Sequence, residues 1–299
     1  MKGLARMLLL IALVAALCGG LAVRPQTAKA GSLWLNDYIA FERGSQIWLM
    51  WPDGNFPGQM THGSAHWKAP TRSGSHLWPG SHLRLAFIRE SSHPTLWQYS
   101  ALTDLNSKIT YRGPSVAGGD ALAWSANGRY IAGESSKGGA SYLTVLDLTH
   151  HRSKKIVRLA GINHVASLSW SPDGKKLLVC EELGDRYRML LVNVAQKKVL
   201  KTYKGSIAAA DWSPHGSRIV YQMQSVSGDR RIMTMRPDGS HKKTLRHRGD
   251  GDVSWSPTGR SIVFVTWSEL GDIYSIWTMR ADGRHQVKVA DNRWRPTWK

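Results

Sequence analysis

This sequence of 299 residues contains twelve histidines, which raises the possibility of a metal site. His66, His76 and His82 lie close together along the chain, and imidazole nitrogens are common ligands of catalytic metals. His76 and His82 flank the turn at Trp78, however, so we expect their side chains to point to different places. We therefore expect no metal or other cofactor, and a metal-dependent hydrolase or lyase is the least favoured function.

Two short motifs resemble catalytic or metal-binding loops only loosely. GPSVAG (113–118) lacks the second glycine at the spacing of a nucleophile elbow, and no strand-to-helix pattern surrounds it. GDGD (249–252) supplies Asp250 and Asp252 but not the remaining ligands of a calcium loop. The sequence also lacks an H-E-x-x-H zinc motif. We therefore predict no catalytic residue and a protein that is not an enzyme.

Tryptophan recurs at a regular interval. The chain has 14 tryptophans but only 4 phenylalanines, and six of the tryptophans are separated by 46, 46, 42, 43 and 43 residues. An apolar residue follows each of the first five by seven positions. A fixed period with a fixed internal offset is typical of a repeated unit, so we expect these rings to pack between units rather than to bind a ligand. The six are Trp78, Trp124, Trp170, Trp212, Trp255 and Trp298.

Each repeat has the pattern of a β-sheet. The stretch WSPDGKKLLV (170–179) combines a Pro/Asp/Gly turn with a strand in which apolar and polar residues alternate. A further strand and turn, such as IWTMRADG (276–283), comes later in the repeat, and a short basic strand such as KKVLKTY (197–203) follows. Each period thus holds about four strands and shows no helical periodicity, which predicts the blades of a propeller.

The two ends of the chain contain complementary parts of one blade. The C-terminus stops at Trp298-Lys299, just after a first strand, whereas residues 35–54 contain a second and a third strand. Pairing these ends closes a ring that has no open sheet edge. We predict an all-β fold in which residues 31–299 form one six-bladed β-propeller of four-stranded antiparallel blades.

The units WSPDGKKLLV and IWTMRADG resemble the repeats of TolB-type propellers, which are also called WD40-like or PD40 repeats. The resemblance covers residues 33–299. It implies an exported six-bladed protein that acts as a protein-interaction platform in the cell envelope. TolB itself has an α/β domain before its propeller, and we expect this chain to lack one and to be a stand-alone TolB-like propeller.

The N-terminus has the features of a secretory signal. Lys2 and Arg6 precede an apolar run (residues 7–23), and Ala28 and Ala30 form an A-x-A cleavage site. We predict that residues 1–30 are a signal peptide cleaved after Ala30, which makes the protein periplasmic, cell-wall-associated or secreted. The alternative is an uncleaved N-terminal helix that tethers the protein to the membrane.

The charge of the mature chain favours anionic partners. Four of the 40 Lys and Arg residues lie in the predicted signal, which leaves 36 against 21 acidic residues and a net charge of +15. We expect a protein or peptide at the mouth of the propeller channel, and an anionic wall polymer or acidic lipid is the alternative. Export and the lack of zinc-finger or RNA-binding signatures argue against nucleic acid, and we expect a monomer.

The loops that lead into the first strand of each blade are predicted to form a basic ring around the channel mouth. Loops between the second and third strands carry mixed or acidic charge and should surround it, which would suit an acidic peptide or an anionic polymer. Trp294 lies outside the repeated slot and is therefore a candidate ligand contact. Besides His66, Lys68 and Arg72, the ring and the predicted partner-binding set contain Arg112, His164, Lys204, His247, Arg248, Arg293, Trp294 and Arg295.

Overall fold

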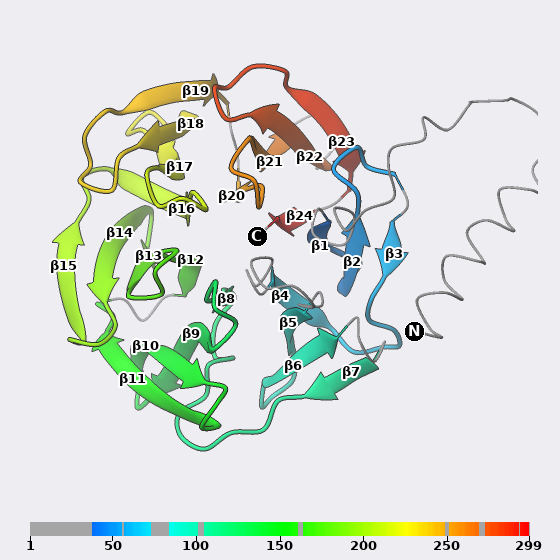
Figure 1. Ribbon diagram of the computed structural model, residues 1–299, viewed down its shortest axis with the longest axis vertical. Coiled ribbons are helices and arrows are strands. Elements are labelled where there is room, and N and C mark those ends of the chain that lie inside the picture. Colours follow the sequence, from blue (N-terminus) through cyan, green and yellow to red (C-terminus); the bar gives the residue numbers. More distant parts are fainter. Residues whose placement is uncertain are drawn as a thin grey trace, which may run out of the picture.

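The computed structural model describes residues 38–55, 57–72, 84–100, 105–160, 164–248, 251–268, 273–292 and 294–298. The predicted signal peptide with its cleavage site at Ala30, and also Trp78 and Arg293, lie outside the described residues. Six four-stranded antiparallel sheets stand around a common axis (Figure 1). The predicted six-bladed propeller is confirmed.

Each blade runs from an inner strand at the axis to an outer strand at the rim. From the inner strand outward, the first blade contains β24 (Trp294–Thr297), β1 (Ile39–Arg43), β2 (Gln46–Met50) and β3 (Gly58–Gln59), and the second contains β4 (Trp67–Arg72), β5 (Arg84–Arg89), β6 (Thr95–Ser100) and β7 (Leu105–Lys108). The third blade contains β8 (Ala123–Trp124), β9 (Tyr130–Lys137), β10 (Ala140–Asp147) and β11 (Arg152–Arg158), and the fourth contains β12 (Val165–Trp170), β13 (Lys176–Leu183), β14 (Arg186–Asn193) and β15 (Lys198–Thr202). The fifth blade contains β16 (Ser206–Trp212), β17 (Ile219–Gln224), β18 (Arg230–Met235) and β19 (Lys243–His247), and the sixth contains β20 (Val253–Trp255), β21 (Ser261–Ser268), β22 (Ile273–Arg280) and β23 (Val287–Asp291).

The ring closes by pairing the two ends of the described chain. β24 lies antiparallel to β1, with Thr297 opposite Ala40, so the last strand becomes the inner strand of the first blade. Figure 1 shows red β24 beside blue β1 close to the axis. The predicted closure between N-terminal strands and the C-terminal strand is therefore confirmed.

The repeated tryptophan ends the inner strand in four blades. Each of these residues lies opposite the apolar residue seven positions later, as Trp170 lies opposite Leu177. All of them are buried, with exposed fractions of 1% to 5%, and Trp298 at the ring closure is 3% exposed. The pairs are Trp124 with Ile131, Trp170 with Leu177, Trp212 with Ile219, and Trp255 with Ile262.

The second blade departs from the predicted slot. Arg72, not Trp78, is the residue opposite Leu85, and its guanidinium donates hydrogen bonds of 3.3 Å to the carbonyl oxygens of Tyr38 and Trp298. The connection from Arg72 to Leu85 is longer than the six residues between Trp170 and Leu177. Counting seven residues back from Leu85 therefore ends within that connection, and the assignment of Trp78 to the slot is corrected to Arg72.

Side chains of the inner strands link neighbouring blades. At four junctions, the side chain of the residue just before the slot offers an oxygen that accepts the backbone N–H of the next slot tryptophan, which satisfies a donor that the sheet leaves unpaired. The donor–acceptor pairs are Trp124 N to Thr71 Oγ1 at 3.1 Å, Trp212 N to Ser169 Oγ at 3.1 Å, Trp255 N to Asp211 Oδ2 at 2.8 Å, and Trp298 N to Ser254 Oγ at 3.3 Å.

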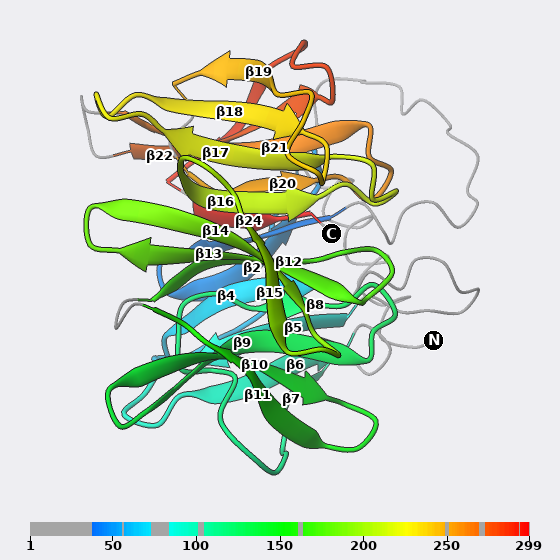
Figure 2. The same cartoon turned by 90° about the vertical axis from the view of Figure 1, so that its left-hand side faces the viewer.

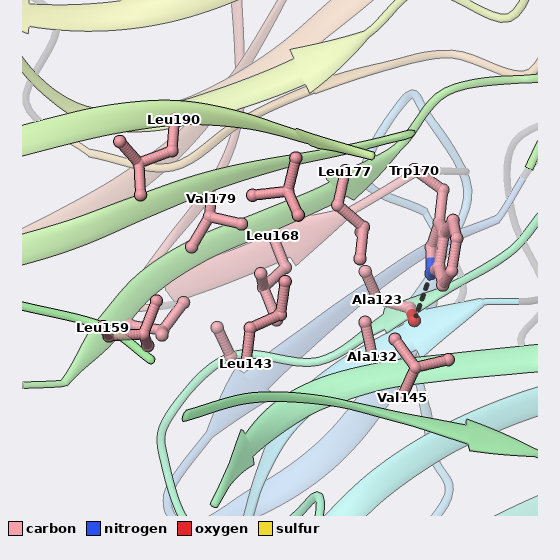
Figure 3. Close-up of a cluster of buried hydrophobic side chains, with 13 residues drawn as sticks. Ala123, Ala132, Leu143, Val145, Leu159, Leu168, Trp170, Leu177, Val179 and Leu190 are labelled. Atoms are coloured by element: carbon pink, nitrogen blue, oxygen red, sulfur yellow. Dashed lines mark hydrogen bonds between the residues drawn. The ribbon is translucent and has the colours of Figure 1, made fainter. Parts of the chain in front are cut away.

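Apolar packing fills the space between blades. In the cluster of Figure 3, Leu143 from β10 and Leu177 and Val179 from β13 face one another across the third and fourth blades. Trp170 completes this cluster, and its Nε1 donates a hydrogen bond of 3.0 Å to the carbonyl oxygen of Ala123 in the neighbouring blade. Each blade is therefore stabilised mainly by its neighbours, because burial of these side chains needs both faces.

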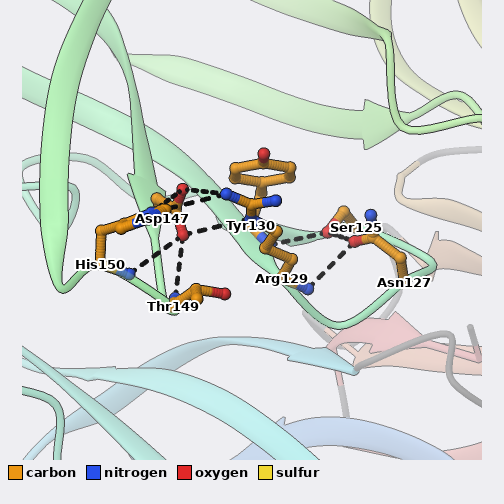
Figure 4. A network of polar contacts seen from close by, with 7 residues as sticks. All are labelled: Ser125, Asn127, Arg129, Tyr130, Asp147, Thr149 and His150. Carbon is orange, nitrogen blue, oxygen red and sulfur yellow. Dashed lines mark hydrogen bonds and ion pairs between the residues drawn. The ribbon is translucent and has the colours of Figure 1, made fainter.

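The turn after each slot is held by its own polar side chains. Ser171 Oγ donates to Asp173 Oδ1 at 2.5 Å and accepts the N–H of Lys176 at 2.9 Å. Gly174 adopts a φ of +67°, in the left-handed region that glycine tolerates. Figure 4 shows the related turn in the third blade, where Asn127 replaces the aspartate and Arg129 extends the network to Asp147. The polar residues of this motif are therefore structural.

Candidate functional site

Two adjoining cavities lie between the inner strands. The first has a volume of about 190 Å³ and an apolar wall that includes Leu122, Leu168 and Val253. Prolines of the turns after the slot border it as well, namely Pro172, Pro214 and Pro257. The repeated turns thus surround an apolar end of the channel.

The second cavity is more polar. Its volume is about 280 Å³, and His164, Tyr187, Gln222, Gln224 and Arg230 contribute hydrogen-bonding groups to its wall. Four residues border both cavities, and we call them the waist: Asp120, Ala166, Asp252 and Arg295. An elongated ligand in the channel would meet apolar groups on one side of the waist and polar groups on the other.

Arg295 is the central side chain of the waist. Its Nη1 lies 3.7 Å from Glu42 Oε1, and its Nη2 lies 3.5 Å from Asp120 Oδ2. Nη1 also donates a hydrogen bond of 3.3 Å to the carbonyl oxygen of Asp120. The guanidinium therefore connects the first blade to the loop that leads into the third.

The backbone at Arg295 is unusual. Its φ is +48°, a conformation that costs about 1 kcal/mol or more in a residue with a side chain. Ala69, which like Arg295 stands before a proline, has a φ of +53°. The pairing register shifts beside both residues, in β24 and in β4. These irregularities change the direction of the inner strands near the waist, as β-bulges do.

Lys68 adds a second cation beside the waist. Its Nζ contacts Asp120 Oδ1 at 2.6 Å and Glu90 Oε1 at 3.0 Å. Burial opposes the charged form of this lysine, but the two carboxylates outweigh that effect and raise the pKa of Lys68. Burial likewise opposes ionisation of Asp120, yet Lys68 and Arg295 lower the pKa of Asp120. Asp120 is therefore ionised at neutral pH.

Two further carboxyl groups, those of Glu42 and Asp252, have raised pKa values, in contrast to Asp120. Glu42 is 3% exposed, and its Oε1 accepts the N–H of Ala69 at 2.6 Å. Burial raises the pKa of Glu42 to about 7, against the opposing effect of Arg295. Burial also raises the pKa of Asp252, again opposed by Arg295. The charge of this region therefore changes with pH near neutrality.

The charge at the centre of the propeller corrects the predicted basic ring. Asp120 and Asp252 border the channel cavities together with Arg72, Arg230 and Arg295, and Asp120 is paired with Lys68 and Arg295. The predicted ring was incomplete because it counted the basic residues of the loops and did not place Asp120 and Asp252, which lie just before β8 and β20, at the channel. The waist is therefore mixed in charge rather than uniformly basic.

Comparison with known proteins decides the family. The family model of the TolB beta propeller domain, PD40, matches residues 85–299. The chain belongs to this TolB-type family. TolB from Acinetobacter baumannii is 18% identical with a TM-score of 0.72, and the match covers 88% of this chain and 67% of that one. A TolB structure from Agrobacterium tumefaciens is 19% identical with a TM-score of 0.67, covering 87% of this chain and 90% of that one.

A curated protein is similar in sequence to part of this chain. This relative, a component of eukaryotic translation initiation factor 3 from Xenopus laevis, is 25% identical over 193 residues. The match covers 58% of this chain and 28% of that protein. The chain thus spans little more than a quarter of the length of this relative. At these identities, the structural likenesses to the TolB proteins show a shared fold.

The predicted partner-binding residues of this TolB-type propeller fall into two groups. His164 and Arg295 border the channel cavities, and Trp294 begins the inner strand β24. The others that the structure describes lie at the rim. Arg112 N donates to the carbonyl oxygen of His151 beside β11 at 2.9 Å, Lys204 follows β15, His247 ends β19, and Arg248 follows it. Arg112, Lys204, His247 and Arg248 therefore lie beside outer strands rather than in one ring with His164 and Arg295, and their role in partner binding stays a prediction.

Sequence reasoning did not place the acidic residues of the waist at the channel: it considered Asp252 only as a calcium ligand and did not consider Asp120. Asp120 stands four residues before Trp124, and Asp252 stands three residues before Trp255. The corresponding positions in the fourth and fifth blades hold small residues such as Ala166 and Ala208. A comparison of repeats at these two offsets would have singled out the acidic pair.

The described residues offer two further findings. Among them, no three His, Cys, Asp or Glu side chains are grouped so as to hold a metal ion. No helix in the same residues is long and apolar enough to span a membrane.

Proposed function

We propose that this TolB-type propeller is an exported, non-enzymatic protein that holds an extended segment of a partner protein in its channel. The observation that carries the proposal is the waist, where Asp120, Asp252 and Arg295 border both an apolar and a polar cavity. A peptide presents apolar side chains and backbone hydrogen-bonding groups along one chain, so it matches both cavities at once. Export rests on the N-terminal segment with its A-x-A site.

The charge of the waist indicates which residue the segment would place there. Arg295 and Lys68 are engaged by carboxylates, and a cation placed beside Asp252 would favour the ionised form of that buried carboxyl group. The segment would therefore place a lysine, an arginine or an amino terminus beside Asp120 and Asp252. Gln222, Gln224 and Tyr187 in the polar cavity can donate or accept hydrogen bonds along its backbone.

Site-specific photo-cross-linking tests the channel. Ala166, which borders both cavities, would be replaced by p-benzoylphenylalanine in the exporting cell, and Val226 on the turn between β17 and β18 would be the control. We expect protein adducts from position 166 and none from position 226. Adducts from neither position, or equal adducts from both, would contradict channel binding.

A second experiment tests the charge preference. Peptides captured by cross-linking would be synthesised with their basic residue kept, changed to glutamine or changed to glutamate. We expect affinity to fall in that order, and Asp252→Asn to remove much of the difference. The control is Asp229→Asn, because the side chain of Asp229 is 67% exposed. Tighter binding of the glutamate peptide would overturn the proposed charge preference.

A further inference from the structure

The outer strands of three consecutive blades carry a concentrated positive charge. We define the basic belt as residues 151–160, 195–204 and 241–248, which contain β11, β15 and β19. Each segment contains four Lys or Arg residues, and none contains Asp or Glu. One third of the 36 basic residues outside the predicted signal therefore lies on the belt.

The belt forms a continuous surface. Figure 1 shows β11, β15 and β19 following one another along the rim, and in Figure 2 β15 faces the viewer with β19 above and β11 below. β11 and β15 also contact one another across the blade boundary. Arg112 pairs through its backbone with Arg152 and extends the surface beyond β11.

Several cations of the belt are exposed and are not neutralised by neighbouring carboxylates. Arg152, Lys154 and Lys198 are exposed, and no ion pair joins them to an acidic side chain within the described residues. Two other belt lysines contact carbonyl oxygens, as Lys243 Nζ does at 3.4 Å from the oxygen of Asp282. Close like charges repel one another unless an anion lies between them.

Protection of sheet edges does not account for this distribution. Lysine on an outer strand prevents pairing with another chain, and that requirement applies to all six blades. The other three outer strands carry at most one cation each, whereas β11 carries four and β15 and β19 carry two each. β3 has no cation, β7 has Lys108, and Lys288 of β23 lies 2.9 Å from Asp291 Oδ2. The charge is thus concentrated on one half of the rim.

We infer that the basic belt binds a flexible polyanion, a wall or surface polymer with repeating phosphate or carboxylate groups. The belt follows the convex rim, so a flat membrane would touch it along a narrow line, whereas a flexible chain can bend around three blades. Eight of the twelve cations are lysines, whose compact charges neutralise anions without demanding one geometry. Repeated anionic groups along a polymer match such a series.

Two variants of equal charge test the inference. The belt variant combines Arg152→Gln, Lys154→Gln, Lys197→Gln and Lys198→Gln. The control variant combines Lys137→Gln, Lys175→Gln, Arg260→Gln and Arg284→Gln, which are exposed positions outside the belt. Both variants should melt like the parent protein, because all eight side chains are exposed.

Binding would be measured to poly(glycerol phosphate), to polygalacturonate and to vesicles rich in phosphatidylglycerol, at salt concentrations from about 50 to 200 mM. We expect polymer binding that weakens with salt, falls about tenfold or more in the belt variant and stays within about twofold in the control. The preferred polymer identifies the anionic group. Equal losses in the two variants, tighter binding to vesicles than to either polymer, or no polymer binding would overturn the inference. Cross-linking from Ala166 should be unaffected in the belt variant, so the outcome is independent of channel binding.

Discussion

Arg295 Nη1 in the last strand lies 3.7 Å from Glu42 Oε1 in the first described strand. This contact exists only in the closed ring, because β24 and β1 come from opposite ends of the sequence. It places the guanidinium beside a carboxyl group that is 3% exposed. Arg295 therefore takes its position in the waist only when the ring closes.

The raised pKa of Glu42 predicts a specific pH dependence of stability. The group ionises near pH 4.5 in the unfolded chain and at about 7 in the folded protein, so the folded state binds more protons between these values. Its contribution to stability is full below pH 4.5 and is lost as pH rises through about 7, by up to about 1.4 kcal/mol per pH unit.

Glu42→Gln should remove this contribution, because the amide does not titrate and its oxygen can still accept the N–H of Ala69. We expect the loss of unfolding free energy between pH 5 and pH 8, measured by chemical denaturation, to shrink by about 2 kcal/mol. Asp229→Asn is the control and should leave the difference unchanged. An unaltered pH dependence in Glu42→Gln would show that another group is responsible.

Removal of residues 295–299 should open the ring. The deletion removes most of β24, including Trp298, which is 3% exposed. Trp298→Ala alone should cost about 3–5 kcal/mol, and the deletion should cost more because β1 also loses its partner strand. Thermal denaturation followed by circular dichroism measures both, with removal of Lys299 alone as the control. A deletion variant that melts like the parent protein would refute the importance of closure.

Trp170 should be a strong determinant of stability. It is 5% exposed and packs in the cluster between the third and fourth blades, where its Nε1 donates to Ala123. We expect Trp170→Ala to lower the free energy of unfolding by about 3–5 kcal/mol. Trp267, which is 39% exposed, provides the comparison, and Trp267→Ala should cost about 1 kcal/mol or less. Similar losses for both would contradict a buried structural role of the slot.

Asp211 should stabilise the junctions among three blades. Its carboxylate accepts the hydroxyl of Ser169 at 2.6 Å and the N–H of Trp255 at 2.8 Å, and it is 6% exposed. Asp211→Ala leaves these donors without this acceptor and should cost about 2–4 kcal/mol in urea denaturation. Asp211→Asn keeps an acceptor oxygen and should cost less. A larger loss in the asparagine variant would be incompatible with this account.

The tryptophan period predicted the number of blades correctly but assigned one residue to the wrong position. It indicated six blades because five of them share the same buried ring, usually followed by the same turn, as Trp170, Ser171 and Asp173 illustrate. These requirements are local, so they leave a regular mark along the chain. The rule failed at Trp78, because a longer connection separates Arg72 from Leu85 while the strand pairing is preserved.

Local pattern therefore determined the fold class, the six blades and the closure of the ring from the sequence alone. Only the tertiary structure decided which charged residues meet. It brought Lys68, Asp120 and Arg295 together from three blades, and it placed Lys204 and His247 at the rim, away from His164. The physical reason is that these groupings depend on ring closure and on bulges in the inner strands, whose effects cross blade boundaries and leave no periodic signal in the sequence.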